Sequence, residues 1–127
     1  MGDTAPVTDS LAERLRHAYE ERDLDQLAPL LAEDVTWGDV THPRGCRNKA
    51  EVLATLWAVM SGGVKGEVTE LSVGAHGLLC ALALRWPEGH ERADRLVLFH
   101  VYLLRDGLIG EIVPFDERGP AALAAGV

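Results

Sequence analysis

Residues 23–39 read DLDQLAPLLAEDVTWGD, and this stretch decides the fold that we predict. Its first half has leucines at helical spacing and predicts a short amphipathic helix, in which Pro29 marks a bend. Its second half predicts a strand, residues 35–40, that carries Trp37 and Asp39. Because side chains alternate along a strand, these two residues lie on the same face. We therefore expect an aromatic ring and a carboxylate in one pocket.

The rest of the chain alternates between helix and strand signals. Residues 11–19 carry one apolar stripe at helical spacing, and Asn48 precedes a third helical segment at residues 49–61. Helices first and strands later predict an α+β fold. We expect a curved, mainly antiparallel sheet wrapped around the N-terminal helices, forming a cone with one internal cavity. Four strand-like runs follow the third helix, at residues 67–73, 78–86, 93–104 and 108–115.

Length and charge limit the class of protein. With 127 residues the chain suits a single domain, residues 1–127, in which residues 1–7 form a loose arm and residues 119–127 a frayed tail. The formal net charge of −8 argues against nucleic acid and anionic membranes as partners, because both select basic surfaces.

Cysteine content and hydropathy bear on location and cofactors. Cys46 and Cys80 are too few for a disulfide framework and lack the spacing of zinc ligands, so we expect a reducing cytoplasm. No apolar run approaches the ~20 residues that span a bilayer, and residues 1–7 lack the features of a signal peptide. The sequence shows neither a metal-ligand cluster nor a glycine-rich phosphate loop, so we expect no metal and no cofactor.

Three segments resemble the cone-shaped superfamily named after nuclear transport factor 2. They are residues 22–37, with RDLD and AEDVTW; residues 45–52, with a loop glycine and a helix start; and residues 105–116, with the turn RDG. This superfamily includes ketosteroid isomerases, scytalone dehydratase, limonene epoxide hydrolase and SnoaL-like polyketide cyclases. The resemblance implies a pocket for an apolar small molecule and a homodimer formed through the outer face of the sheet.

The resemblance also implies roles for individual residues. Asp39 stands where ketosteroid isomerases keep the carboxylate that moves a proton, and His100 stands where they keep an acidic donor to the substrate oxygen. Asp116 resembles one of the catalytic aspartates of limonene epoxide hydrolases. Leu15 occupies the position of the isomerase tyrosine, and Tyr19 lies one turn later on the same face. An aspartate and a histidine in the cavity are compatible with a SnoaL-like cyclase.

Each candidate catalytic residue has a simpler structural interpretation. His100 fits a hydrogen-bonded core residue, Asp39 fits a cap on the following loop, and Asp116 fits a turn. Poor hydration beside Trp37 and Val40 is expected to raise the pKa of Asp39 toward the range of a general base. The side chains expected to form the substrate-binding walls are Tyr19, Trp37, Trp57, Met60 and Tyr102.

Three functions fit these observations. A cofactor-free enzyme would use Asp39 as base and His100 as hydrogen-bond donor, in isomerisation, cyclisation or dehydration of an apolar, carbonyl-bearing compound. A non-catalytic binding module would keep the cavity and tolerate loss of Asp39. A dimerisation domain would fill its cavity with Trp37, Trp57 and Met60. Its interface would be the outward-facing residues of the third strand-like run, Val97, Phe99, Val101 and Leu103.

Overall fold

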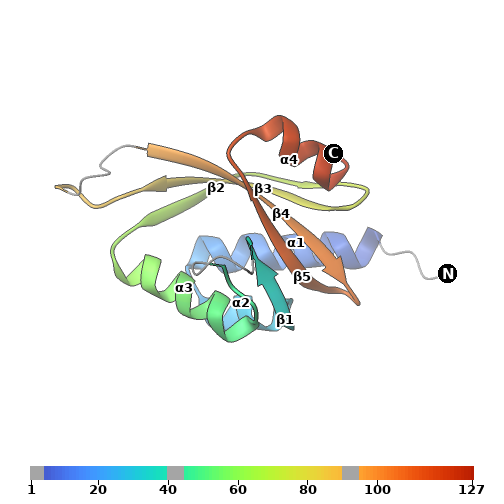
Figure 1. Cartoon of the computed structure of the whole chain (residues 1–127), viewed down its shortest axis with the longest axis horizontal. Coiled ribbons are helices and arrows are strands. Elements are labelled where there is room, and N and C mark those ends of the chain that lie inside the picture. Colours follow the sequence, from blue (N-terminus) through green and yellow to red (C-terminus); the bar gives the residue numbers. More distant parts are fainter. Residues whose placement is uncertain (1–4, 40–44, 90–94) are drawn as a thin grey trace.

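The structure, a computed structural model, describes residues 5–39, 45–89 and 95–127, which form one sheet with helices on both faces (Figure 1). Helices α1, α2 and α3 cover one face, and α4 covers the other. The predicted α+β class is confirmed. The elements in chain order are α1 (Ala5–Glu21), α2 (Leu24–Leu27), the 3-10 helix η1 (Ala28–Leu30), β1 (Leu31–Trp37), α3 (Lys49–Ser61), β2 (Lys65–Val73), β3 (Gly77–Arg85), β4 (Arg95–Arg105), β5 (Leu108–Phe115) and α4 (Arg118–Ala125).

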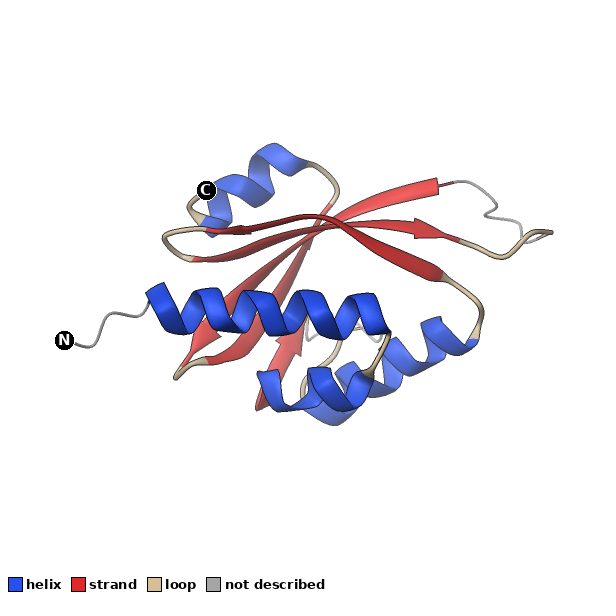
Figure 2. Ribbon diagram, turned by 180° about the vertical axis from the view of Figure 1, so that it is seen from behind, coloured by secondary structure: helices blue, strands red, loops and turns tan. Residues whose placement is uncertain are grey.

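The sheet has the strand order β1-β5-β4-β3-β2. Strands β2 to β5 pair antiparallel with their neighbours, while β1 pairs parallel with β5, so the sheet is mixed. It curves around α1, which lies along its concave face (Figure 2). Alternation along β4 sends Tyr102 into the core beneath α1 and Val101 into the core beneath α4.

Helix α1 is amphipathic and buries one stripe against the concave face. Leu11, Leu15 and Ala18 recur at the predicted spacing and are at most 4% exposed. Full burial of a leucine side chain stabilises the fold by about 2 kcal/mol. Burial of this stripe therefore holds α1 on the sheet although the other faces of the helix are charged. The helix already begins at Ala5, so residues 5–7 of the predicted loose arm are helical, and residues 1–4 lie outside the described part of the chain.

Strand β1 begins earlier and ends earlier than the sequence predicts. The 3-10 turn η1 contains Pro29 at its start and stops at Leu30, so Leu31 already pairs with β5. At the other end, Gly38 has a φ of +72°, a left-handed conformation that turns the chain out of the strand. Asp39 therefore follows β1 instead of belonging to it, and strand alternation no longer relates it to Trp37.

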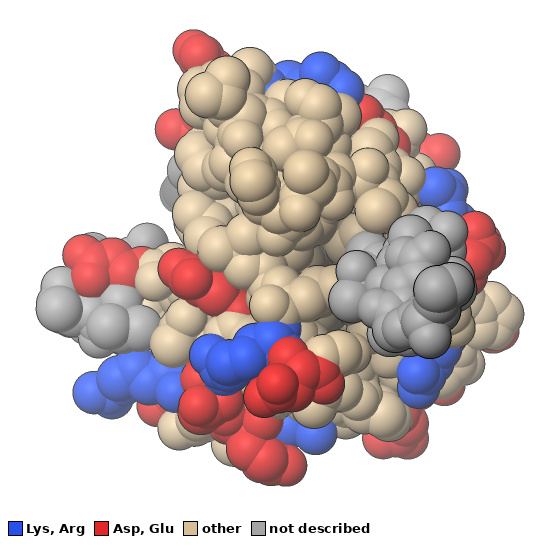
Figure 3. Space-filling view, turned by 90° about the vertical axis from the view of Figure 1, so that its right-hand side faces the viewer, with Lys and Arg blue, Asp and Glu red and all other residues tan. Residues whose placement is uncertain are grey.

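The C-terminal segment is an ordered helix where a frayed tail was expected. Ala121, Ala122 and Ala125 of α4 are at most 9% exposed and pack on Leu79 and Val101 of the outer sheet face. Small residues allow the helix to lie close to the sheet. In the space-filling view, the surface at the top, where α4 lies, is largely without charged side chains, and charges gather lower down (Figure 3).

Both ends of α4 are fastened to the sheet. The Arg118 guanidinium donates to both carboxylate oxygens of Glu70 on β2, at 2.9 and 2.7 Å. At the other end, the backbone amides of Ala75 and His76 donate to the carbonyls of Gly126 and Ala125, at 3.1 and 2.9 Å. The helix thus crosses the outer face and covers part of the surface that we expected a second subunit to meet.

Candidate functional site

An enclosed cavity lies between the concave face of the sheet and helices α1, α2 and α3. Its free volume is about 10 Å³, which is room for about one water molecule. Most of the wall is aliphatic, and the side chains with polar groups are a tyrosine from α1, a tryptophan from β1, and a histidine and a tyrosine from β4. The residues that line it are Tyr19, Leu27, Leu31, Trp37, Val52, Leu56, His100, Tyr102 and Ile112.

Two tyrosines meet at this cavity from distant parts of the chain. The hydroxyls of Tyr19 on α1 and Tyr102 on β4 are hydrogen-bonded at 2.6 Å. Cys80 on β3 is fully buried and interacts with the Tyr102 hydroxyl. Burial raises the pKa of each of the two phenols well above its usual value, so both hydroxyls keep their protons at neutral pH.

His100 lies in the middle of β4, between two aromatic rings. Its imidazole meets the rings of Trp37 and Tyr102 edge-on, with centroids at 5.5 and 6.2 Å. The side chain is 5% exposed, and its Nδ1 has no hydrogen-bond partner among the groups that the structure describes. Burial lowers the pKa of His100 to about 4, which keeps the ring neutral at pH 7. A neutral imidazole with an unused nitrogen is suited to contact an uncharged polar group.

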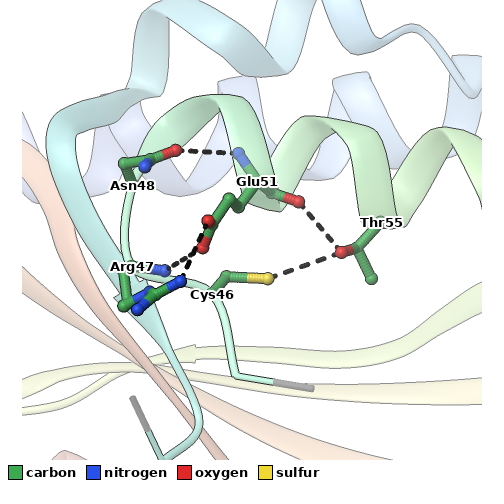
Figure 4. A network of polar contacts seen from close by, with 5 residues as sticks. All are labelled: Cys46, Arg47, Asn48, Glu51 and Thr55. Carbon is green, nitrogen blue, oxygen red and sulfur yellow. Dashed lines mark hydrogen bonds and ion pairs between the residues drawn. The ribbon is translucent and has the colours of Figure 1, made fainter. Parts of the chain in front are cut away.

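The N-terminus of α3 is held by a capping network, which sets where Val52 and Leu56 enter the cavity wall (Figure 4). The Glu51 amide donates to Asn48 Oδ1 at 2.9 Å, and the Arg47 amide donates to Glu51 Oε1 at 2.8 Å. The Asn48 contact satisfies an amide that the first turn of a helix leaves without a partner, and the Glu51 carboxylate holds the residue before the cap.

A second set of contacts ties the same helix to β1. Cys46 and Trp37 exchange two backbone hydrogen bonds of 2.9 Å, and the Cys46 sulfur lies 3.4 Å from the Thr55 hydroxyl of α3. The thiol points toward Thr55 in Figure 4. Trp37, on the cavity wall, is therefore linked through Cys46 to the first two turns of α3.

The structure brings together four of the residues singled out in the sequence. Tyr19, Trp37, His100 and Tyr102 line the same cavity, although they come from α1, β1 and β4. The roles that the resemblance implies for these residues remain predictions.

Asp39 and Asp116 do not line this cavity. Asp39 is exposed just beyond Gly38, and Asp116 is exposed just beyond the end of β5. The prediction that both carboxylates share the cavity with His100 is therefore wrong in this structure. The poor hydration on which the expected pKa shift of Asp39 rested is also absent, because the side chain is exposed.

Trp57 and Met60 belong to a different hollow on the surface. This open hollow, of about 550 Å³, lies between the end of α1, α2 and the end of α3. Trp57 is 64% exposed, so neither the predicted apolar wall nor the predicted filling of the cavity by this residue is correct. One helical step separates it from Leu56, which does line the cavity. The hollow is lined by Glu21, Arg22, Asp23, Leu24, Asp25, Trp57, Met60 and Ser61.

A family model described as a SnoaL-like domain matches residues 12–112. The chain belongs to the SnoaL-like family. Solved structures, one of them described as an NTF2-like protein, share its fold, so the family model and the fold together confirm the resemblance and the cone-shaped architecture. No curated protein sequence matches the chain.

Three similar structures show the extent of the match. A candidate polyketide cyclase from Xanthomonas campestris pv. campestris has a TM-score of 0.71 and 17% identity, covering 98% of this chain and all of the other. A candidate ketosteroid isomerase from Kribbella flavida has a TM-score of 0.71 and 22% identity, over 88% of this chain and 78% of the other. An NTF2-like protein of unknown function from Mesorhizobium loti has a TM-score of 0.70 and 14% identity, over 92% and 96%. At these identities the similarity establishes only the fold of the SnoaL-like chain. Its chemistry has to be inferred from the residues of the cavity.

Cys80 is a polar group of this SnoaL-like site that the sequence interpretation passed over. It reads as one apolar residue in an apolar strand, GLLCALALR, and only the register of β3 against β4 places it opposite His100. Within the described residues, no group of three or more His, Cys, Asp or Glu side chains is arranged to hold a metal ion. No helix in the described part of the chain is long and apolar enough to cross a membrane.

Proposed function

We propose that this SnoaL-like protein is a cofactor-free acid–base enzyme that acts on an apolar, carbonyl-bearing small molecule. The observation that carries the proposal is the grouping of uncharged hydrogen-bonding side chains, His100, Tyr19 and Tyr102, in an otherwise apolar enclosed cavity. Such a site favours a ligand with a single polar oxygen and an apolar body. Among the residues that line it, none carries a charge at neutral pH, so an ionised ligand would lose its hydration without a compensating partner.

The proposed chemistry is removal of a proton next to the carbonyl carbon. A carboxylate oxygen of Asp39 takes the proton, the electron pair of the C–H bond forms a carbon–carbon double bond, and negative charge develops on the carbonyl oxygen. Hydrogen bonds from His100 and the tyrosine pair would stabilise that oxygen. Returning the proton to another carbon completes an isomerisation, while carbon–carbon bond formation or loss of hydroxide would complete a cyclisation or a dehydration.

The role proposed for Asp39 rests on its place in the chain, directly after the cavity wall. It follows Trp37, a wall residue, by two positions, and the chain turns at Gly38 in between. The free volume of about 10 Å³ means that a bound substrate must displace wall side chains, which would also change what surrounds Asp39. The proposal therefore requires a bound state that is more open than the structure described.

The test is exchange of the carbon-bound protons of 1-indanone in D₂O, followed by mass spectrometry. The wild type is expected to exceed the buffer rate, and Asp39→Asn to lower the enzymatic rate ~10²-fold or more, the usual contribution of a positioned base. Asp25→Asn is the matched control, because it removes one exposed carboxylate that lies outside the cavity. If Asp39→Asn stays within about threefold of wild type, Asp39 is not the base and Asp116 becomes the next candidate.

A binding-only role is the second candidate, and the exposure of Asp39 favours it. A protein of this kind would bind 1-indanone without accelerating exchange, and Asp39→Asn would leave its affinity unchanged. Calorimetric titration beside the exchange assay distinguishes the two functions, because only the enzyme links binding to proton transfer.

A further inference from the structure

Helix α3 turns an apolar face outward, at the periphery of the molecule in Figure 1. Residues 52–61 carry no charged side chain, yet among the described residues of this helix only Val52 is buried. The exposed side chains of the outer face recur at helical spacing and are Ala50, Ala54, Trp57, Ala58 and Ser61. A surface helix normally turns charged and polar residues toward the solvent, so an apolar outer face indicates a contact surface.

The open hollow of about 550 Å³ continues this face at the C-terminal end of α3. Its apolar side chains are Leu24, Trp57 and Met60. Trp57 is 64% exposed, although a tryptophan buries most of its surface in a typical protein. Tryptophan is also one of the residue types that most often anchor protein interfaces. The exposed ring therefore marks the point where an occupant of this face would gain most.

The hollow also carries a net negative charge. Its charged side chains are three carboxylates, from Glu21, Asp23 and Asp25, and one guanidinium, from Arg22. Arg22 donates a hydrogen bond to the carbonyl of Val64 at 3.1 Å, which ties it to the segment between α3 and β2. An occupant with positive charge complements this end of the face.

We propose that the outer face of α3 and this hollow form a docking surface for a basic, amphipathic helical segment of a partner protein. Apolar side chains of the partner lie along the alanines of α3, where small residues allow a close approach. A lysine or arginine of the partner lays its stem on Trp57 and points its charge toward the carboxylates, as in a cation–π contact. This inference goes beyond the proposed function, because none of the exposed residues of this face lines the cavity.

The length of the face favours a helical segment over a small molecule. From Ala50 to Ser61 it extends about 16 Å along the helix axis, or three turns. A ligand confined to the hollow would meet Trp57 and leave the alanines uncovered. A partner helix of similar length covers the alanines and reaches the hollow at the same time.

Charge argues against a second copy of this chain as the occupant. A two-fold contact brings the same patch of both subunits together, and the chain has a formal net charge of −8. Laid antiparallel, a second copy would bring the other end of α3 to the hollow. The cations there are already paired, Arg47 with Glu51 at 3.7 Å and Lys49 with Glu33 at 3.6 Å, so that end offers no excess positive charge.

The first experiment titrates the full chain into two fluorescein-labelled peptides of about 16 residues, long enough to form a helix, and follows fluorescence anisotropy. Both peptides carry leucines at helical spacing. One has arginines at the flanking positions, and its twin has glutamates there. The basic peptide is expected to bind, and the acidic twin at least ~10-fold more weakly. Absence of binding of the basic peptide up to ~1 mM protein would overturn the proposal.

The apolar part of the contact is tested with Trp57→Ala, which is expected to weaken binding of the basic peptide ~10-fold or more. Leu123→Ala is the matched control, because Leu123 is an exposed apolar residue of α4, on the other face of the sheet. It should change the affinity less than about twofold. Both side chains are exposed, so both variants are expected to keep the wild-type circular dichroism. Equal losses in the two variants would contradict docking on α3.

The charged part is tested with Glu21→Gln combined with Asp23→Asn. Asparagine at position 23 keeps the side-chain acceptor for the Asp25 amide, so the start of α2 is retained. We expect binding to weaken about 3- to 10-fold at low salt and less at high salt. Glu111→Gln with Glu117→Gln removes two exposed carboxylates outside the hollow and should have little effect. Equal losses in both pairs would mean that net charge alone attracts the peptide, which would refute the proposal.

Sedimentation tests the remaining occupant, a second copy. Trp57→Ala is expected to leave the association state of the chain as it is in the wild type. If Trp57→Ala instead dissociates a wild-type dimer, a second copy covers the outer face of α3 and the proposed partner segment is wrong.

Discussion

His100 is a titratable side chain that is almost entirely shielded from solvent. The imidazole is 5% exposed, it lies edge-on to two aromatic rings, and its Nδ1 has no partner among the described groups. Leaving a buried polar atom unpaired costs about 1–3 kcal/mol, a cost that a ligand contact would remove. The same burial makes the charged form of the ring unfavourable in the folded state.

This burial predicts a loss of stability at mildly acidic pH. The pKa of His100 is about 4 in the folded protein, against 6.5 for an ordinary exposed histidine, so the unfolded state binds more protons between these values. The free energy of unfolding should therefore fall as pH drops from about 6.5 toward 4, by up to about 3 kcal/mol from this group. Urea denaturation at several pH values from 4 to 8 measures this free energy. His100→Gln is the control, because glutamine has no group that titrates in this range. Parallel pH profiles for the two proteins would contradict the expected burial.

At the scale of the element, the capping network of α3 carries a second prediction. Asn48→Ala removes the side-chain acceptor for the Glu51 amide and is expected to lower the free energy of unfolding by about 1 kcal/mol. Asn48→Asp keeps the acceptor and is the matched control. Chemical denaturation of the three proteins checks this, and equal stabilities of the wild type and Asn48→Ala would mean that the cap does not hold the helix.

The close contact between the end of α4 and Gly74 gives another prediction at the scale of the element. A Cβ atom on Gly74 would lie 2.1 Å from the Ala125 carbonyl oxygen, so Gly74→Ala must push the end of α4 away from the sheet. Its φ is not in the left-handed region, so the effect comes from this contact. We expect a loss of about 1–3 kcal/mol in the free energy of unfolding and faster amide exchange in α4.

Gly119→Ala in the first turn of α4 is the control for that variant. A Cβ atom there meets nothing within 4 Å, and alanine has the higher helix propensity. Stability should be unchanged or slightly raised. If Gly74→Ala behaves in the same way as Gly119→Ala, the close approach of α4 to the turn after β2 is not present in solution.

At the scale of the whole molecule, the homodimer expected from the superfamily remains a prediction. The residues expected at its interface, however, differ from those that we inferred from the sequence. Helix α4 covers Val101, which is fully buried, so a partner would meet Leu123 on the outside of α4, 81% exposed, and Val97 beyond it, 41% exposed. We expect sedimentation at tens of micromolar to show a dimer, and Leu123→Asp with Val97→Asp to yield a monomer with unchanged circular dichroism. A wild type that is monomeric at this concentration would rule out this mode of assembly.

What the sequence determined by itself is the fold class and every element but α4, in the right order. Helical and strand periodicities are local signals, and so are the Asn48 cap and the RDG turn, which is why α1, α3 and the antiparallel strands fall near their predicted ranges. The order of helices and strands then leaves few arrangements, and the superfamily followed from residues 22–37 and the final hairpin.

What only the tertiary structure decided is which side chains share the cavity. A single left-handed residue, Gly38, takes Asp39 out of the strand, and one step around α3 separates the exposed Trp57 from Leu56 in the wall. Cys80 lies opposite His100 because β3 pairs with β4 in one register. These outcomes depend on a backbone angle, on the face that a helix turns toward the sheet, and on a pairing between distant strands, and the local amino-acid pattern sets none of the three.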